Sequence, residues 1–209
     1  MFLCNMSFNP KLENFLGEIT ALKVSSERQE TLKNLADLIK SVDGLNSHVN
    51  LNFICTHNSR RSQIAELMLR LSAAYFKLNY ISTFSGGTEA TALNNRVVNA
   101  LETAGFKINL LEEGENPVYT ISFIKDGSEE PTMFSKTYDH SSNPDKIIAV
   151  MVCSDAEQNC PFIPGAEHRF SLKYEDPKHA DDSPSEASVY ENKLKEIGSE
   201  MYFLAKLLA

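Results

Sequence analysis

The chain has 209 residues, a formal net charge of −8 at pH 7 and 42% hydrophobic residues, with four cysteines. A negative chain without a basic stripe argues against nucleic-acid binding, and no apolar run is long enough to cross a membrane. The start of the chain has neither the basic end nor the apolar core of a secretory signal. Because few cysteines are typical of a reducing compartment, we expect a cytoplasmic protein.

Two amphipathic helices are predicted at the start of the chain. The first has apolar side chains at helical spacing, at Leu12, Phe15, Leu16, Ile19 and Leu22. The second begins at a capping box formed by Ser26 and Gln29, and Gly44 marks its end. We therefore predict a helical extension over residues 1–48 and a main domain over residues 49–209. The extension either docks on a partner or packs on its own domain, and the second alternative is favoured because an apolar helix face is usually core.

The main domain alternates predicted strands and helices. Strands are expected at residues 49–55, 80–84 and 147–152, and helices after the first strand, at residues 94–104 and at residues 185–208. This order predicts an α/β fold, a three-layer open parallel sheet with helices on both faces. Residues 118–138 break the order with alternating side chains and a turn at Asp126-Gly127, which indicates an inserted hairpin. The hairpin rims a functional site, contacts a partner or caps an exposed sheet edge.

The strongest local signal is the loop that follows the first strand. It begins at Cys55 and leads into a helix, so its backbone N–H groups and the helix N-terminus can converge on an anion. Arg61 can hold two oxygens of that anion with its planar guanidinium, and Arg60 adds positive charge. The same field favours the thiolate form of Cys55, which makes it a nucleophile. The expected oxyanion-binding residues are Thr56, His57, Asn58, Ser59, Arg60, Arg61 and Ser62.

Two further cysteines follow the strand at residues 147–152. Cys153 and Cys160 lie past its carboxyl end, where ligands bind in open α/β sheets, so Cys153 can approach Cys55 if the two strands are neighbours. The alternatives are incidental thiols or a zinc site with His57 or His168, although the spacing is unusual for zinc. Cys4 is most simply a spare thiol.

A polar loop carries a carboxylate beside a proline. Asp176 precedes Pro177 in this loop, which suits a general acid carried on a lid. The alternative is an ordinary turn residue, because Asp-Pro pairs commonly begin turns.

Together these motifs resemble the low-molecular-weight protein tyrosine phosphatase superfamily, and within it most closely the thioredoxin-coupled arsenate reductases. The resemblance covers residues 49–209 and rests on four segments, at residues 55–66, 84–89, 153–161 and 176–177. The chain departs from the family at His57, where glycine is usual and a positive φ is often required. It also has Arg60 where many members have a cysteine, and Lys178 and His179 where phosphatases commonly have tyrosines.

The resemblance implies an arsenate reductase that works through three cysteines. Cys55 would attack arsenate while Asp176 protonates the departing oxygen, Cys153 would then attack Cys55, and Cys160 would resolve the disulfide for reduction by thioredoxin. No tightly bound cofactor is expected. The resemblance also implies a possible potassium site; the alternative is that Asn58 braces the loop and Glu66 is solvated. The potassium ligands would be Asn58, Glu66 and Ser85.

Two other functions stay open at this point. A low-molecular-weight phosphatase would hydrolyse phosphotyrosine or a small phosphate ester through a phosphocysteine at Cys55, with Cys153 and Cys160 as redox protection. A non-catalytic protein would bind an oxyanion and report it, for example through the amino-terminal helices. The electron donor is also open between thioredoxin and other thiol systems.

Overall fold

The computed structural model describes residues 8–42, 48–123, 131–154, 156 and 163–209. Four features singled out in the sequence lie outside these residues: Cys4, Gly44, the Asp126-Gly127 turn and Cys160. Within the described residues, no helix combines the length and the apolar character needed to span a bilayer.

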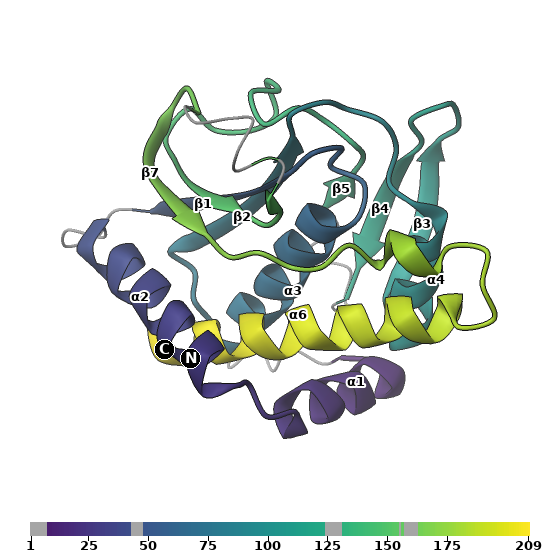
Figure 1. Cartoon of the computed structure of the whole chain (residues 1–209), viewed down its shortest axis with the longest axis horizontal. Coiled ribbons are helices and arrows are strands. Elements are labelled where there is room, and N and C mark those ends of the chain that lie inside the picture. The colour runs from purple at the N-terminus through teal and green to yellow at the C-terminus, as the bar shows by residue number, and fades with distance from the viewer. Residues whose placement is uncertain (1–7, 43–47, 124–130, 155, 157–162) are drawn as a thin grey trace, which may run out of the picture.

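The central sheet has four parallel strands (Figure 1). Its strands are β1 (Val49–Cys55), β2 (Ile81–Gly87), β6 (Ile147–Met151) and β7 (Ala166–Ser171), in the order β2-β1-β6-β7. β6 is buried along its whole length and β1 nearly so, as expected for central parallel strands. Ile54 of β1 pairs with Met151 of β6, so the carboxyl ends of these two strands lie side by side. This edge is where open α/β sheets bind ligands.

Helices flank the sheet, so the predicted α/β fold is confirmed. α3 (Arg61–Phe76) packs against β1, β2 and α6 (Glu186–Leu208), and α6 also contacts α4 (Asn95–Ala104). The predicted helix ends are close to the observed ones because the caps are local. Asn94 caps α4 by accepting a hydrogen bond from the Arg96 N–H, and Gly105 ends it with a φ of 104°.

The amino-terminal helices pack on the rest of the chain. α1 (Pro10–Ala21) contacts α4 and α6, and α2 (Ser26–Val42) contacts α6. The predicted capping box is wrong, because Ser25 rather than Ser26 accepts a hydrogen bond from the Arg28 N–H. Leu22 follows the end of α1 and is exposed. Of the two alternatives for the extension, the structure shows packing on its own chain.

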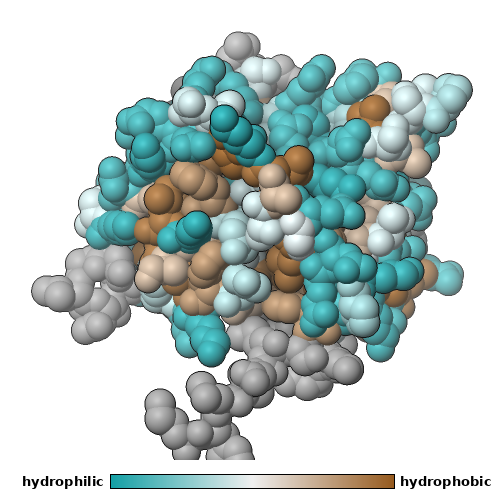
Figure 2. Space-filling view, turned by 90° about the horizontal axis from the view of Figure 1, so that it is seen from below, coloured by the Kyte–Doolittle hydropathy of each residue, from teal (hydrophilic) through white to brown (hydrophobic). Residues whose placement is uncertain are grey.

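A second sheet is antiparallel, with the order β3-β4-β5. It consists of β3 (Lys107–Glu112), β4 (Val118–Ser122) and β5 (Thr132–Met133). The predicted hairpin is confirmed by the pairing of β4 with β5, whereas β3 was not predicted. β3 is an edge strand, and its Leu110 and Leu111 are exposed. Figure 2 views the molecule from the side on which α1 lies and shows apolar areas among polar side chains on that face.

Candidate active site

Cys55 lies at the end of β1 with its thiol free and buried. Its Sγ is 3.0 Å from the Ser62 Oγ at the start of α3. The Ser62 Oγ accepts a hydrogen bond of 2.9 Å from the Asn58 Nδ2, so its own proton is free to point at the sulfur. A donated hydrogen bond and the N-terminus of α3 both place positive potential at the sulfur.

Asn58 shapes the loop from within. Its Oδ1 accepts hydrogen bonds from the Lys136 N–H at 2.9 Å and from the Gln63 Nε2 at 3.2 Å. Asn58 also has a φ of 46°, in the left-handed region that asparagine tolerates better than most residues. The strain expected at His57 is therefore absent, because the loop places its positive φ one residue later.

The His57 imidazole pairs with a carboxylate outside the loop. The ring Nε2 lies 2.8 Å from the Glu89 Oε1, and both side chains are about half exposed. Its backbone carbonyl accepts a hydrogen bond of 2.8 Å from the Ser135 Oγ. The His57 side chain is therefore engaged by Glu89 at the surface, whereas its backbone carbonyl is held by Ser135.

The segment after β5 supports the outside of the loop. Besides the Ser135 and Lys136 contacts, the Phe134 carbonyl accepts a hydrogen bond of 2.8 Å from Gln63. Residues 136–138 also pair with the edge strand β2 at Gly87. Of the three alternatives for the inserted hairpin, the structure therefore supports both rimming the loop and capping a sheet edge, and contact with a partner stays a prediction.

Gly87 allows the loop to pack directly on β2. A Cβ atom at this position would lie 2.6 Å from the Thr56 carbonyl oxygen and 2.8 Å from the Asn58 nitrogen, and it would also clash with the Glu89 carbonyl. The N–H groups of Thr88 and Glu89 bond the carbonyls of Cys55 and Thr56. A side chain at Gly87 is therefore incompatible with the observed loop.

Arg61 and Asp176 face each other across the site. The Arg61 Nη2 lies 2.7 Å from the Asp176 Oδ2, and the Arg61 Nη1 donates to the Tyr174 carbonyl at 3.2 Å. The Arg61 Nε is buried and has no hydrogen-bond partner among the described residues, so it remains available to an anion. Asp176 also accepts a hydrogen bond from the Lys178 N–H and caps the 3₁₀ helix η1 (Pro177–Ala180). It is thus both a turn residue and a neighbour of Arg61.

Cys153 lies beside the same loop. Its thiol is free and fully buried, and its Sγ is 3.6 Å from the Thr56 Oγ1. The Val152 N–H donates to the Ile54 carbonyl at 2.9 Å, which continues the pairing of the two strands up to the cysteines. The Ala156 N–H donates to the Cys153 sulfur at 3.3 Å. Cys55 and Cys153 therefore follow neighbouring strands at one edge of the sheet.

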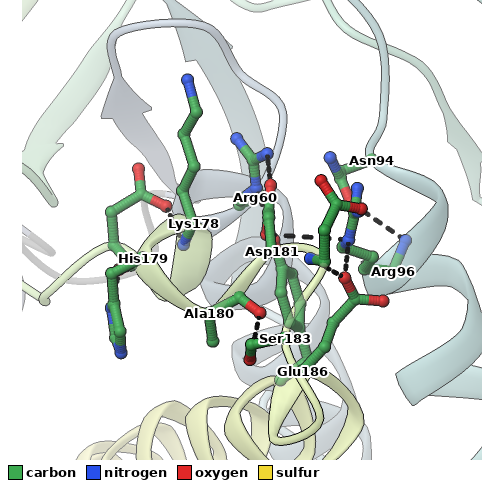
Figure 3. Close-up of polar contacts among 12 residues, drawn as sticks. Arg60, Asn94, Arg96, Lys178, His179, Ala180, Asp181, Ser183 and Glu186 are labelled. Atoms are coloured by element: carbon green, nitrogen blue, oxygen red, sulfur yellow. Dashed lines mark hydrogen bonds and ion pairs between the residues drawn. The ribbon is translucent and has the colours of Figure 1, made fainter.

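Arg60 lies in a network that holds the segment after η1 (Figure 3). Its Nη2 is 3.1 Å from the Asp181 Oδ2, and its Nε donates to the Tyr190 hydroxyl at 2.8 Å. Tyr190 donates in turn to the Asp181 Oδ1 at 2.6 Å, and burial together with this bond raises the pKa of Tyr190 to about 12. Arg96 extends the network to Glu186 at 2.6 Å. The expected contribution of the Arg60 side chain to the anion field is therefore small, because Asp181 neutralises its charge.

The residues expected to hold potassium are partly occupied by other protein groups, and the ion site stays a prediction. The buried Oε2 of Glu66 and Oγ of Ser85 have no hydrogen-bond partner among the described residues, as a cation site would require. The Asn58 Oδ1, however, already accepts two hydrogen bonds. Glu66 pairs with Arg70 at 3.2 Å and lies close enough to the buried Lys136 to influence its titration, although burial dominates and lowers the pKa of Lys136. The alternative in which Asn58 braces the loop fits better, whereas Glu66 is buried rather than solvated.

Within the described residues, no group of three histidine, cysteine, aspartate or glutamate side chains could hold a metal ion. His168, one of the two histidines considered for zinc, is an exposed residue of β7. Cys153 instead contacts Thr56.

Several residues of the site were missed by sequence reasoning, because each is brought to the loop by a distant part of the chain: Tyr174, Asp181, Tyr190, Ser135 and Lys136.

The parallel sheet, the cysteine loop that leads into α3 and the opposing arginine and aspartate define the class as an α/β protein with a buried cysteine at the carboxyl edge of its sheet. No protein-family model matches the chain. The arsenate reductase of Shouchella clausii is 27% identical over 154 residues, which cover 71% of this chain and 89% of the relative. Arsenate reductase 2 of Staphylococcus epidermidis is 26% identical over 125 residues, which cover 60% of this chain and 76% of the relative.

Solved structures agree with this fold. A low-molecular-weight protein tyrosine phosphatase from Bacillus subtilis aligns with a TM-score of 0.51 and 18% identity, covering 77% of this chain and 97% of that one. A YwlE mutant from the same organism aligns with a TM-score of 0.50 and 17% identity, covering 76% and 97%. The chain is therefore similar in sequence to proteins named arsenate reductases, and it shares the fold of a low-molecular-weight protein tyrosine phosphatase.

Proposed function

We propose that this protein is an arsenate reductase that uses Cys55, Cys153 and Cys160 in sequence. The observation that carries the proposal is the position of Cys153, whose buried sulfur contacts Thr56 inside the oxyanion loop. A second buried thiol beside the nucleophile allows a disulfide to form, whereas phosphate-ester hydrolysis needs only one cysteine. The names of the sequence relatives support the same assignment.

In the first step, the Cys55 thiolate attacks the arsenic atom of bound arsenate. An S–As bond forms, and an As–O bond breaks as Asp176 gives its proton to the departing oxygen, which leaves as water. Arg61 and the loop amides stabilise the negative charge of the oxygens. The Ser62 hydroxyl lies 3.0 Å from the Cys55 sulfur and can donate a hydrogen bond to it before the attack.

In the second step, the Cys153 thiolate attacks the Cys55 sulfur. A disulfide forms, the S–As bond breaks, and its electron pair stays on arsenic, which is reduced from the pentavalent to the trivalent state and leaves as arsenite. The two sulfurs together lose the two electrons that arsenic gains, so the step balances. Phosphorus in the corresponding adduct is not readily reduced by a thiol, and that adduct is released only by hydrolysis.

In the third step, Cys160 attacks Cys153 and releases Cys55 for another turnover. The resulting Cys153 to Cys160 disulfide is reduced by thioredoxin, which supplies the two electrons that the cycle consumes. A reducing compartment such as the cytoplasm would supply this donor.

A phosphatase is the second function that specific observations favour. The loop, Arg61 and Asp176 would serve phosphocysteine formation as well as thiol-arsenate formation. Under that alternative, Cys153 would protect Cys55 through a reversible disulfide. A non-catalytic oxyanion sensor is a third alternative, and sustained product formation would exclude it.

The test is a coupled assay with purified protein. NADPH consumption is measured with thioredoxin and thioredoxin reductase after addition of arsenate, in parallel with hydrolysis of an aryl phosphate. We expect arsenate-dependent turnover that is abolished in Cys153→Ser and retained in Cys4→Ser, which removes a thiol outside the proposed relay. Steady aryl phosphate hydrolysis without NADPH consumption would instead favour the phosphatase.

A further inference from the structure

An arginine of the amino-terminal extension reaches a buried carboxylate of the main domain. The Arg28 guanidinium in α2 makes a bidentate contact with Glu200 in α6, with distances of 2.7 Å from Nε to Oε1 and 2.5 Å from Nη2 to Oε2. Glu200 is only 5% exposed. A buried carboxylate requires such a partner, because an unpaired charge in the interior is strongly unfavourable.

Glu200 also holds the side chain of Tyr174. The Tyr174 hydroxyl donates to the Glu200 Oε2 at 2.7 Å, and the Arg28 guanidinium lies 4.9 Å from the centre of the Tyr174 ring. Tyr174 is buried, and its pKa is raised by burial and by the negative charge of Glu200. Arg28, Glu200 and Tyr174 therefore form one buried cluster, called the Arg28 cluster below.

The backbone of Tyr174 connects the Arg28 cluster to the active site. Its N–H donates to the Val152 carbonyl at 3.1 Å, directly before Cys153, and its carbonyl accepts the hydrogen bond from Arg61. Asp176 follows two residues later and pairs with the same arginine. A displacement of Tyr174 would therefore shift the carbonyl that orients the Arg61 guanidinium and the loop that carries Asp176.

We propose that Arg28 is a positioning residue for the oxyanion site, and that through it the amino-terminal extension takes part in binding the anion. Arg28 does not contact the substrate. It neutralises Glu200, Glu200 fixes the Tyr174 side chain, and the Tyr174 carbonyl fixes Arg61. The catalytic consequence rests on the proposed function, whereas the effect on anion binding requires only that Arg61 binds an oxyanion.

The test measures anion binding without turnover. Inorganic phosphate is titrated against the rate at which iodoacetamide alkylates Cys55, for the wild type and for Arg28→Met, which keeps most of the side-chain length but removes the charge. We expect the phosphate concentration for half-maximal protection to rise about tenfold or more, because Arg61 loses its orientation. Arg28→Lys should recover part of the affinity, since it restores the charge without the bidentate geometry.

A matched control separates positioning from general stability. Lys195 of α6 pairs with Glu18 of α1 at 2.7 Å, so it also joins the extension to α6, but neither residue belongs to the Arg28 cluster. In Lys195→Met, phosphate should protect Cys55 from alkylation at the same concentration as in the wild type. If Arg28→Met does not fold, as judged by circular dichroism, Tyr174→Phe carries the test, because it keeps the ring and the backbone and loses only the bond to Glu200.

The outcomes are distinguishable from those of the proposed function. Unchanged phosphate protection in folded Arg28→Met or Tyr174→Phe would overturn the proposal. Equal losses in Arg28→Met and Lys195→Met would also overturn it, since they would indicate a general effect on packing. Wild-type protein that binds phosphate but does not reduce arsenate would contradict only the reductase assignment, whereas failure of phosphate to protect wild-type Cys55 would contradict the oxyanion site and this proposal with it.

Discussion

The Ser62 hydroxyl lies 3.0 Å from the sulfur of Cys55 and accepts a hydrogen bond from the Asn58 amide. Because the Asn58 amide occupies one acceptor position of the oxygen, the Ser62 hydroxyl can donate its proton to the sulfur. Cys55 at the end of β1 and Ser62 in the first turn of α3 are seven residues apart, so the loop between them holds the nucleophile beside this hydroxyl.

Ser62→Ala should slow the reaction of Cys55. A hydrogen bond to a charged group contributes about 1.5–3 kcal/mol, so its loss should lower the alkylation rate and the turnover number about 10- to 100-fold. Ser72→Ala is the control, because Ser72 is equally buried on α3 but bonds the Met68 carbonyl. Equal rates for Ser62→Ala and the wild type would mean that the thiolate does not depend on this hydroxyl.

Gly87→Ala should disrupt the oxyanion loop. The added Cβ would overlap the Thr56 carbonyl, so the loop or β2 must shift, which should lower the free energy of unfolding by about 1–3 kcal/mol and weaken phosphate binding. Gly17→Ala is the control, because no atom lies within 4 Å of a Cβ at that helical position. It should stabilise α1 by about 0.5–1 kcal/mol and leave binding unchanged. Wild-type phosphate affinity in Gly87→Ala would show that the loop does not need this contact.

Asp176→Asn should remove proton donation to the leaving group. The expected loss in turnover is about 10²- to 10⁴-fold, and with aryl phosphates it should be larger for a poor leaving group than for a good one. Asp182→Asn is the control, because the exposed Asp182 carboxylate pairs with Arg96, its backbone N–H donates to Glu186, and asparagine tolerates its φ of 61°. A loss independent of the leaving group would assign Asp176 to positioning Arg61 instead.

Tyr190 should make the protein less stable at high pH. Its pKa is about 12 in the folded chain and 10.0 when unperturbed, so between these values the folded state keeps a proton that the unfolded state releases. The free energy of unfolding should therefore fall as the pH rises from about 10 to about 12. Tyr190→Phe should be less stable near neutral pH but should lose less stability in that window, as measured by urea denaturation. An identical pH dependence in both proteins would contradict the assigned pKa.

The fold was predictable where its signals are local. β1 has the predicted bounds, and α4 begins and ends beside its capping residues Asn94 and Gly105. β3 was not predicted because it is an exposed edge strand whose identity depends on pairing with β4.

The site, like the fold, was predictable only where its signals are local in the sequence. The loop with Cys55 and Arg61 is continuous in sequence and was predicted, whereas its supports come from distant segments. Asp181 is 121 residues from Arg60, and Tyr174 is 113 residues from Arg61. No periodicity or spacing indicates such pairs, because they form only when the tertiary structure brings the segments together.

The most direct test of the three-cysteine relay is peptide mapping by mass spectrometry after a single turnover. The Cys160→Ser variant is fully reduced, mixed with one equivalent of arsenate in the absence of thioredoxin, and alkylated. The proposal predicts one equivalent of arsenite and a disulfide that joins Cys55 to Cys153, trapped because the third thiol is missing. Arsenite formed while Cys153 remains open to alkylation, or no arsenite and no disulfide at all, would contradict the relay.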